Sequence, residues 1–195
     1  MVIRLDVKIM RNFVIALVGI AFFCPVFVAA LESDIFPELV YITAIREGNV
    51  EKVESFLQRG YDVNKVDGKG LIPLFYAATD GNVDMTETLL RYRANFNFRD
   101  SLGNTPLIWA CGRGHREVAE ILIEAGSDIN IQNRSGFTPL MRAVETGQRE
   151  IVEFLIKKGA DLTLQDYTGG DVQTLADNGR NRHIQKIVKE ALQGN

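Results

Sequence analysis

One fixed spacing, 33 residues, repeats through most of this 195-residue chain. Gly70, Gly103, Gly136 and Gly169 are each separated by this spacing. The same step separates three further sets: Ala44, Ala77, Ala110, Ala143 and Ala176; Pro73, Pro106 and Pro139; and Leu74, Leu107 and Leu140. A period of this size is typical of stacked units, each of which buries its apolar face against its neighbours. It constrains the fold more than any single residue does.

The segment 100–132 shows what one unit contains. Thr105 can cap a helix that begins at Pro106, because proline needs no N–H partner at the first helical position. Gly112 and Gly114 are expected to end this short helix. A second helix carries one apolar face, made of Val118, Ile121, Leu122 and Ala125. Gly126 then ends it in the left-handed conformation, and a loop with a tight turn leads to the next unit.

The units resemble ankyrin repeats. The resemblance rests on Thr105-Pro106-Leu107, Thr138-Pro139-Leu140 and Gly114-His115, and on the endings at residues 125–130 and 159–161. It implies an all-α solenoid of stacked helix-turn-helix repeats with β-turn fingers. We expect an ankyrin repeat domain at 34–195, with three full repeats between two capping repeats. These are a cap at 34–66, repeats at 67–99, 100–132 and 133–165, and a C-terminal cap at 166–195.

Some units depart from the pattern. In the second repeat Ile72 replaces the capping threonine and Arg93 replaces the glycine that ends the second helix. We therefore expect its helices to start and stop less sharply, and expect it to be the least stable internal unit. The end units carry polar residues at positions that are apolar elsewhere, which keeps a repeat array soluble. These residues are Lys52, Ser55 and Gln173.

The first thirty residues predict a secretory signal peptide. Basic residues precede an apolar run from Phe13 to Leu31. The small residues Ala29 and Ala30 stand near the end of this run, where a signal peptidase requires small side chains. We expect cleavage after Ala30, and Met10 is an alternative start. An uncleaved membrane anchor is the rival interpretation, because the run is about as long as a spanning helix. Lipid attachment at Cys24 is disfavoured by the aromatic residues before it.

Cleavage would remove three basic residues and one acid, leaving 19 basic and 24 acidic side chains and a net charge of −5. This balance predicts neither nucleic-acid binding nor stable membrane insertion of the mature chain. Cys111 would be the one remaining cysteine, so no intramolecular disulfide could form. The expected location is periplasmic or secreted, and the expected state is a monomer.

The sequence predicts no catalytic residue, cofactor or metal site. His115 and His183 have no cysteine or second histidine at ligand spacing, and His115 has a structural role in the family that the chain resembles. Cys111 is interpreted as a small core residue, with oxidation sensing as the alternative. The residues that begin the turns are expected to bond their own backbone rather than calcium. These residues are Asp67, Asp100, Asn133 and Asp166.

The resemblance implies a protein partner that is bound by turn tips and the exposed side of the first helices. Carrying the family's variable positions onto this chain gives candidate contacts. An apolar row along the tips would include Leu71, Leu102, Phe137 and Tyr167, although these side chains could instead pack tip against tip. Trp109 is expected to pack in the core. The candidates are Lys69, Leu71, Tyr76, Asp80, Leu102, Asn104, Arg113, Ser135, Phe137, Glu145 and Tyr167.

These patterns predict an exported, non-catalytic scaffold that binds an unidentified protein. Similar exported bacterial ankyrin proteins include some that are associated with protection against oxidative stress, and that role is an alternative. A secreted effector or immunity-type protein acting outside the cell is another.

Overall fold

The computed structural model describes residues 37–194, in which the chain forms ten α-helices and no extended strand. The all-α solenoid expected from the period is therefore confirmed. The predicted signal peptide, its cleavage site and the alternative start at Met10 lie outside the described residues. The helices are α3 (Pro37–Arg46), α4 (Val50–Gln58), α5 (Pro73–Asp80), α6 (Val83–Arg91), α7 (Pro106–Arg113), α8 (Arg116–Glu124), α9 (Pro139–Glu145), α10 (Arg149–Lys157), α11 (Val172–Asn178) and α12 (Arg182–Gly194).

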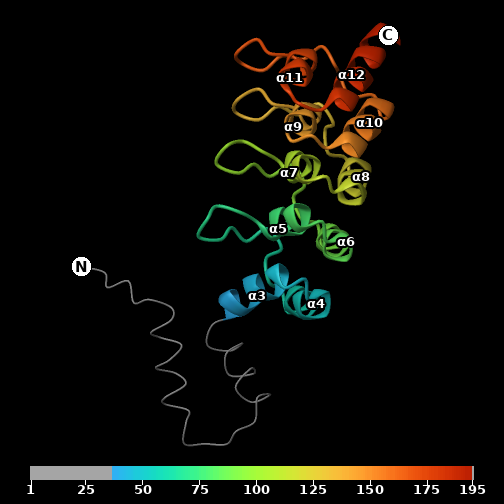
Figure 1. Ribbon diagram of the computed structural model, residues 1–195. Helices are drawn as coiled ribbons and strands as arrows, with labels where there is room; N and C mark the ends of the chain where they lie inside the picture. The colour runs from blue at the N-terminus through green and yellow to red at the C-terminus, as the bar shows by residue number, and fades with distance from the viewer. Residues whose placement is uncertain (1–36, 195) are drawn as a thin grey trace, which may run out of the picture. The chain divides into compact units, whose positions relative to one another are not determined.

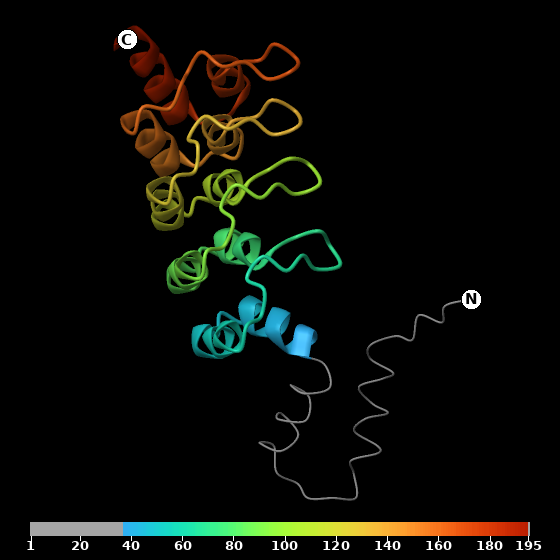
Figure 2. The same ribbon diagram turned by 180° about the vertical axis from the view of Figure 1, so that it is seen from behind.

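Contacts divide the chain into two compact units between Val40 and Tyr41. The described part of the first unit is the start of α3, Pro37–Val40. In the second unit, α5, α7, α9 and α11 pack in succession as an inner layer, and α4, α6, α8, α10 and α12 form an outer layer (Figure 1). Four loops extend on the same side of the inner layer (Figure 2). They are called finger 1 (62–72), finger 2 (95–105), finger 3 (128–138) and finger 4 (161–171).

The inner helices α5, α7 and α9 begin at proline, as the sequence predicts, and α11 begins at Val172. The Thr105 hydroxyl accepts a hydrogen bond from the Ile108 N–H at 3.4 Å, and Thr138 accepts one from Met141 at 3.1 Å. Each bond satisfies one of the free N–H groups at a helix start. Ile72, before α5, has no side chain that can do this. The α5 N-terminus therefore lacks a stabilising cap that α7 and α9 have.

The helix ends correct two details of the sequence interpretation. Gly112 lies inside α7, which ends at Arg113, so Gly114 alone supplies the left-handed cap. Ala125 is exposed, because α8 ends one residue before it and Ala119 takes its place on the buried face. Gly126 has a φ of 105°, as expected for the residue that ends this helix.

The expectation that the second repeat has less sharply defined helices is wrong. The bounds of α5 and α6 lie one full repeat period before those of α7 and α8. Ile72 adopts the same extended backbone as Thr105, and Arg93 adopts the left-handed conformation of Gly126, with a φ of 65°. The left-handed region is unfavourable for a residue with a Cβ atom. The departures therefore cost stability at the caps and leave the helix limits unchanged.

The core lies between the two layers and continues from unit to unit. Equivalent leucines of the inner helices, Leu74, Leu107 and Leu140, are all buried, as is Cys111. The predicted core role of Cys111 is thus confirmed. His115 lies with Nε2 2.9 Å from the Thr79 carbonyl oxygen of the preceding repeat. This contact joins neighbouring repeats and confirms the structural role expected for His115.

Candidate protein-binding surface

Each finger turns around one Asp or Asn side chain. In all four turns the Oδ1 atom accepts the N–H groups two and four residues further on, at 2.8–3.0 Å. The turn residues are Asp67, Asp100, Asn133 and Asp166. The prediction that these side chains bond their own backbone is confirmed. Because one oxygen holds two amides, the tip of each finger has a defined shape.

Backbone hydrogen bonds join fingers 2, 3 and 4 at their tips. The Arg134 N–H donates to the Leu102 carbonyl at 3.0 Å, and the Tyr167 N–H donates to the Ser135 carbonyl at 3.1 Å. Nearer the base, Arg99 Nη1 donates to the Gln132 carbonyl at 2.7 Å, and Gln132 Nε2 donates to the Gln165 carbonyl at 2.9 Å. These three fingers therefore form one hydrogen-bonded strip.

Finger 1 is attached differently. Ser101 is the equivalent of Arg134 and Tyr167, and among the described residues its N–H makes no backbone hydrogen bond to finger 1. Val66 stands where fingers 2 and 3 have Arg99 and Gln132, and it is exposed and apolar. Nearer the base, Asn64 accepts from the Asn95 N–H at 2.7 Å and donates to the Arg93 carbonyl at 3.4 Å. The tip of finger 1 therefore lacks the backbone bonds that hold its neighbours.

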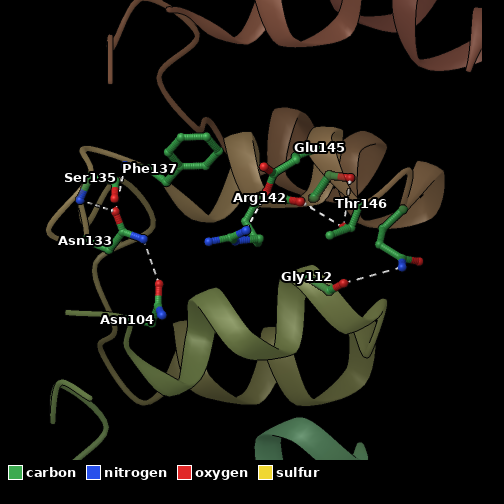
Figure 3. A network of polar contacts seen from close by, with 10 residues as sticks. Asn104, Gly112, Asn133, Ser135, Phe137, Arg142, Glu145 and Thr146 are labelled. Atoms are coloured by element: carbon green, nitrogen blue, oxygen red, sulfur yellow. Dashed lines mark hydrogen bonds and ion pairs between the residues drawn. The ribbon is translucent and has the colours of Figure 1, made fainter. Parts of the chain in front are cut away.

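A buried polar network lies beneath the tips of fingers 2 and 3. Asp100 Oδ2 accepts from Asn104 Nδ2 at 3.1 Å and from Trp109 Nε1 at 2.8 Å. Asn133 Nδ2 in turn donates to Asn104 Oδ1 at 2.7 Å (Figure 3). Asn104 is 3% exposed, so its place among the candidate contacts is wrong: it connects two fingers. Trp109 is half-buried against its own turn, which corrects the expectation that it packs in the core.

Tyr76 occupies the position equivalent to Trp109, and its hydroxyl donates to Asp67 Oδ2. Burial, followed by the Asp67 carboxylate, raises the pKa of Tyr76 to about 12. Burial alone would raise the pKa of Asp67, but the hydrogen bonds from Tyr76, Leu71 and Lys69 outweigh it and lower that pKa. The Tyr76 ring also carries the Arg46 guanidinium, 5.8 Å from its centre. Tyr76 is therefore half-buried, with its hydroxyl occupied by Asp67 and with Arg46 over its ring.

Arg142 is the third residue of this equivalent set, and the sequence interpretation did not include it among the candidates. Its guanidinium lies 5.2 Å from the centre of the Phe137 ring, and Nη1 donates to Glu145 (Figure 3). A Cβ atom on Gly112 would lie 2.7 Å from Arg142 Cγ, so only glycine there leaves room for this side chain. Alignment of the repeats could have identified Arg142, because it stands one repeat period after Trp109.

The apolar row expected along the tips is uneven. Leu102 is 61% exposed and Tyr167 71% exposed, whereas Leu71 and Phe137 are half-buried. The Arg142 guanidinium lies over the Phe137 ring, and the Leu71 N–H donates to the turn residue Asp67. The other candidates are exposed on the tips and inner helices; they are Lys69, Asp80, Arg113, Ser135 and Glu145. Fingers 2 and 4 therefore present the large apolar side chains of this surface.

Metal-ligating groups and the one described cysteine bear on whether the described residues hold a site for chemistry. In residues 37–194, no three His, Cys, Asp or Glu side chains come together in a group that could hold a metal ion. Burial strongly raises the pKa of the Cys111 thiol, which disfavours the thiolate that oxidation requires. In the same range no helix has the length and apolar character needed to cross a membrane.

Comparison with known families agrees with this architecture. A family model described as "Ankyrin repeats (3 copies)" matches residues 41–133, and one described as "Ankyrin repeats (many copies)" matches residues 122–170. A search of curated proteins finds no match. The chain belongs to the ankyrin repeat family. Ankyrin repeats are modules for protein–protein interaction, and proteins built from them are generally scaffolds without catalytic activity.

Proposed function

We propose that this chain is an exported scaffold that binds a protein partner through its finger tips and inner helices. The observation that carries the proposal is the pair of exposed side chains Leu102 and Tyr167 on fingers whose backbones are bonded together. Apolar side chains on ordered backbone lose little freedom when they are buried by a partner. Tyrosine, as at position 167, is among the residues that often supply much of the binding energy.

The binding role can be tested by affinity capture from the envelope of the source organism. We expect the double change Leu102→Ser and Tyr167→Ser to abolish recovery of the partner. Both side chains are exposed, so the fold should be retained. The control is Glu87→Ser with Lys157→Ser, because both residues are exposed on the outer helices. Recovery of the same partner by the Leu102/Tyr167 variant would contradict the proposal.

Export is the second part of the proposal, and residues 1–31 support it through their basic start, apolar run and small residues. We propose a periplasmic location for the mature chain. N-terminal sequencing of the protein recovered from the envelope should find a start near Leu31. Recovery with the apolar run still attached would favour the membrane anchor instead, and recovery from the culture medium would favour an effector released outside the cell.

A further inference from the structure

Equivalent positions in three repeats carry side chains with different partners. Tyr76 and Trp109 each donate a hydrogen bond to the acidic turn residue of their own repeat, Asp67 and Asp100. In the next repeat the donor is Arg142. A charged donor therefore replaces the neutral aromatic donors of the two preceding repeats. A charged donor needs an acceptor that balances its charge.

The turn residue of that repeat does not supply the acceptor. It is the neutral Asn133, whose Nδ2 donates to Asn104 and whose Oδ1 holds the turn amides. Arg142 extends instead over the Phe137 ring and above Gly112, on the open inner face (Figure 3). Its guanidinium lies beside the Phe137 ring of finger 3, and the hydrogen bond that it donates goes to Glu145.

The charge of Arg142 is only weakly satisfied within the chain. In the described part of the structure its ion-pair partner is Glu145, three residues later on the same helix, and the two side chains are 31% and 43% exposed. Exposed pairs of this kind contribute little to stability. From the flanking helices, α7 presents the exposed Arg113, and the equivalent positions of α11 carry the uncharged residues Leu175 and Asn178.

We propose that Arg142 binds an Asp or Glu side chain of the partner protein, and that Glu145 occupies the guanidinium until the partner carboxylate replaces it. This inference rests on the proposed binding function and names the chemistry of the partner at the centre of the inner face. A guanidinium binds a carboxylate with two parallel hydrogen bonds, which a single contact within the chain does not use. The Phe137 ring lies 5.2 Å from the guanidinium and attracts it, which favours one position for this side chain.

The arrangement fits a carboxylate better than a phosphate. Recognition of a phosphorylated side chain typically uses a cluster of arginines, and here Arg142 has one exposed arginine, Arg113, on a neighbouring helix. The Glu145 carboxylate is already seated on Nη1, so the position accepts a carboxylate. The partner segment would lie across α7 and α9, with Leu102 and Tyr167 contacting its flanks.

The test uses a library of random linear peptides displayed on phage and selected on the folded wild-type domain. We expect the selected peptides to be enriched in Asp or Glu at one position. Binding of a selected peptide should weaken about tenfold or more in Arg142→Gln, because a charge-assisted hydrogen bond is lost. It should tighten about two- to fivefold in Glu145→Gln, because the competing carboxylate is removed.

A matched control exists on the outer layer. Arg149 and Glu153 form a similar exposed ion pair, with 56% and 45% exposed side chains. Arg149→Gln and Glu153→Gln should leave peptide affinity unchanged. Since all four changed side chains are exposed or half-buried, thermal unfolding should show that every variant remains folded.

Two outcomes would overturn the inference, and they differ from failure of the binding function. Peptides that need Leu102 and Tyr167 but show no acidic position, or that bind Arg142→Gln as well as wild type, would leave the binding surface intact and exclude the carboxylate contact. Weaker binding to Glu145→Gln would also contradict it, because Glu145 would then be a contact rather than a competitor. Selection of no peptide that depends on this face would count against both proposals.

Discussion

Finger 1 and fingers 2–4 have the same turn chemistry but different attachments. Each turns around an Asp or Asn that holds two backbone amides, yet only fingers 2, 3 and 4 are bonded tip to tip. Across the junction between fingers 1 and 2, Val66 replaces a bridging side chain and Ser101 makes no backbone bond to the neighbouring tip in the described structure. A shared repeat therefore makes each finger, while individual side chains decide whether neighbouring fingers act together.

The same contrast appears in the second repeat as a whole. It lacks a side-chain cap on α5 and holds Arg93 in the left-handed region. Elements with few fixed contacts open locally at lower cost than the rest of a fold. We expect finger 1 to move independently and fingers 2–4 to present a preformed surface to a partner.

The largest change in the free energy of unfolding is expected from the buried polar network beneath fingers 2 and 3. Asn104→Ala should destabilise the fold by about 2–3 kcal/mol, because it removes one of the two bonds to Asp100 Oδ2 and leaves the buried Asn133 Nδ2 without its acceptor. The equivalent residue of finger 1 is Leu71, which is half-buried, and Leu71→Ala should cost about 1 kcal/mol. Urea unfolding measures both. Equal losses would remove the distinction between the two fingers.

Removing the backbone strain at Arg93 should raise the free energy of unfolding rather than lower it. Arg93→Gly should stabilise the fold by about 1 kcal/mol, since glycine adopts a φ of 65° without the penalty of a Cβ atom. The control is the reverse change, Gly126→Arg, at the equivalent position of the third repeat, which should lose a similar amount. If Arg93→Gly proves neutral or destabilising, the second repeat is not strained at this cap.

The pH dependence should differ with the turn residue. Burial alone would raise the pKa of Asp67, but its hydrogen bonds lower that pKa below the ordinary 3.8. A lowered folded-state pKa means that its contribution to stability is present above pH 3.8 and is lost as pH falls through the folded value. Unfolding midpoints between about pH 5 and 2 should fall less steeply in Asp67→Asn, which copies the Asn133 turn. An unchanged slope would show that the Asp67 turn does not contribute to acid sensitivity.

The smallest change in the free energy of unfolding is expected from a new side-chain hydrogen bond between fingers 1 and 2. Val66→Arg places a guanidinium where Arg99 donates to the next finger, and it should stabilise the fold by about 0.5 kcal/mol. Val66→Leu keeps the residue apolar and serves as the control in thermal unfolding. A gain of the same size in both variants would assign the effect to packing rather than to a hydrogen bond.

The period of the sequence predicted much of this fold, because caps and left-handed glycines act locally. Thr105, Pro106 and Gly126 each determine a helix end through their own backbone or a near neighbour. The limits of α5 and α6 were the exception, since Ile72 is buried in the stack and the exposed Arg93 adopts the left-handed conformation next to the buried Ala94.

The contacts between repeats were not predictable in the same way. Asn104 was interpreted as an exposed tip residue, but its side chain turns inward to meet Asn133 of the next finger. The sequence alone does not distinguish Arg142, because a single arginine in a helix is ordinarily solvent-exposed. The repeat period identifies matching positions, but the direction of each side chain depends on which groups of the adjacent repeat it can contact. The export signal and the partner contacts remain predictions.

Hydrogen exchange measured by NMR at three equivalent amides tests the central claim most directly. Arg134 and Tyr167 donate across the tips of fingers 2–4, whereas the Ser101 N–H makes no backbone bond to finger 1 in the described structure. Arg134 and Tyr167 should therefore exchange more slowly than Ser101 after correction for intrinsic rates. Equal protection at all three amides, or slower exchange at Ser101, would contradict a preformed strip formed by fingers 2–4 alone.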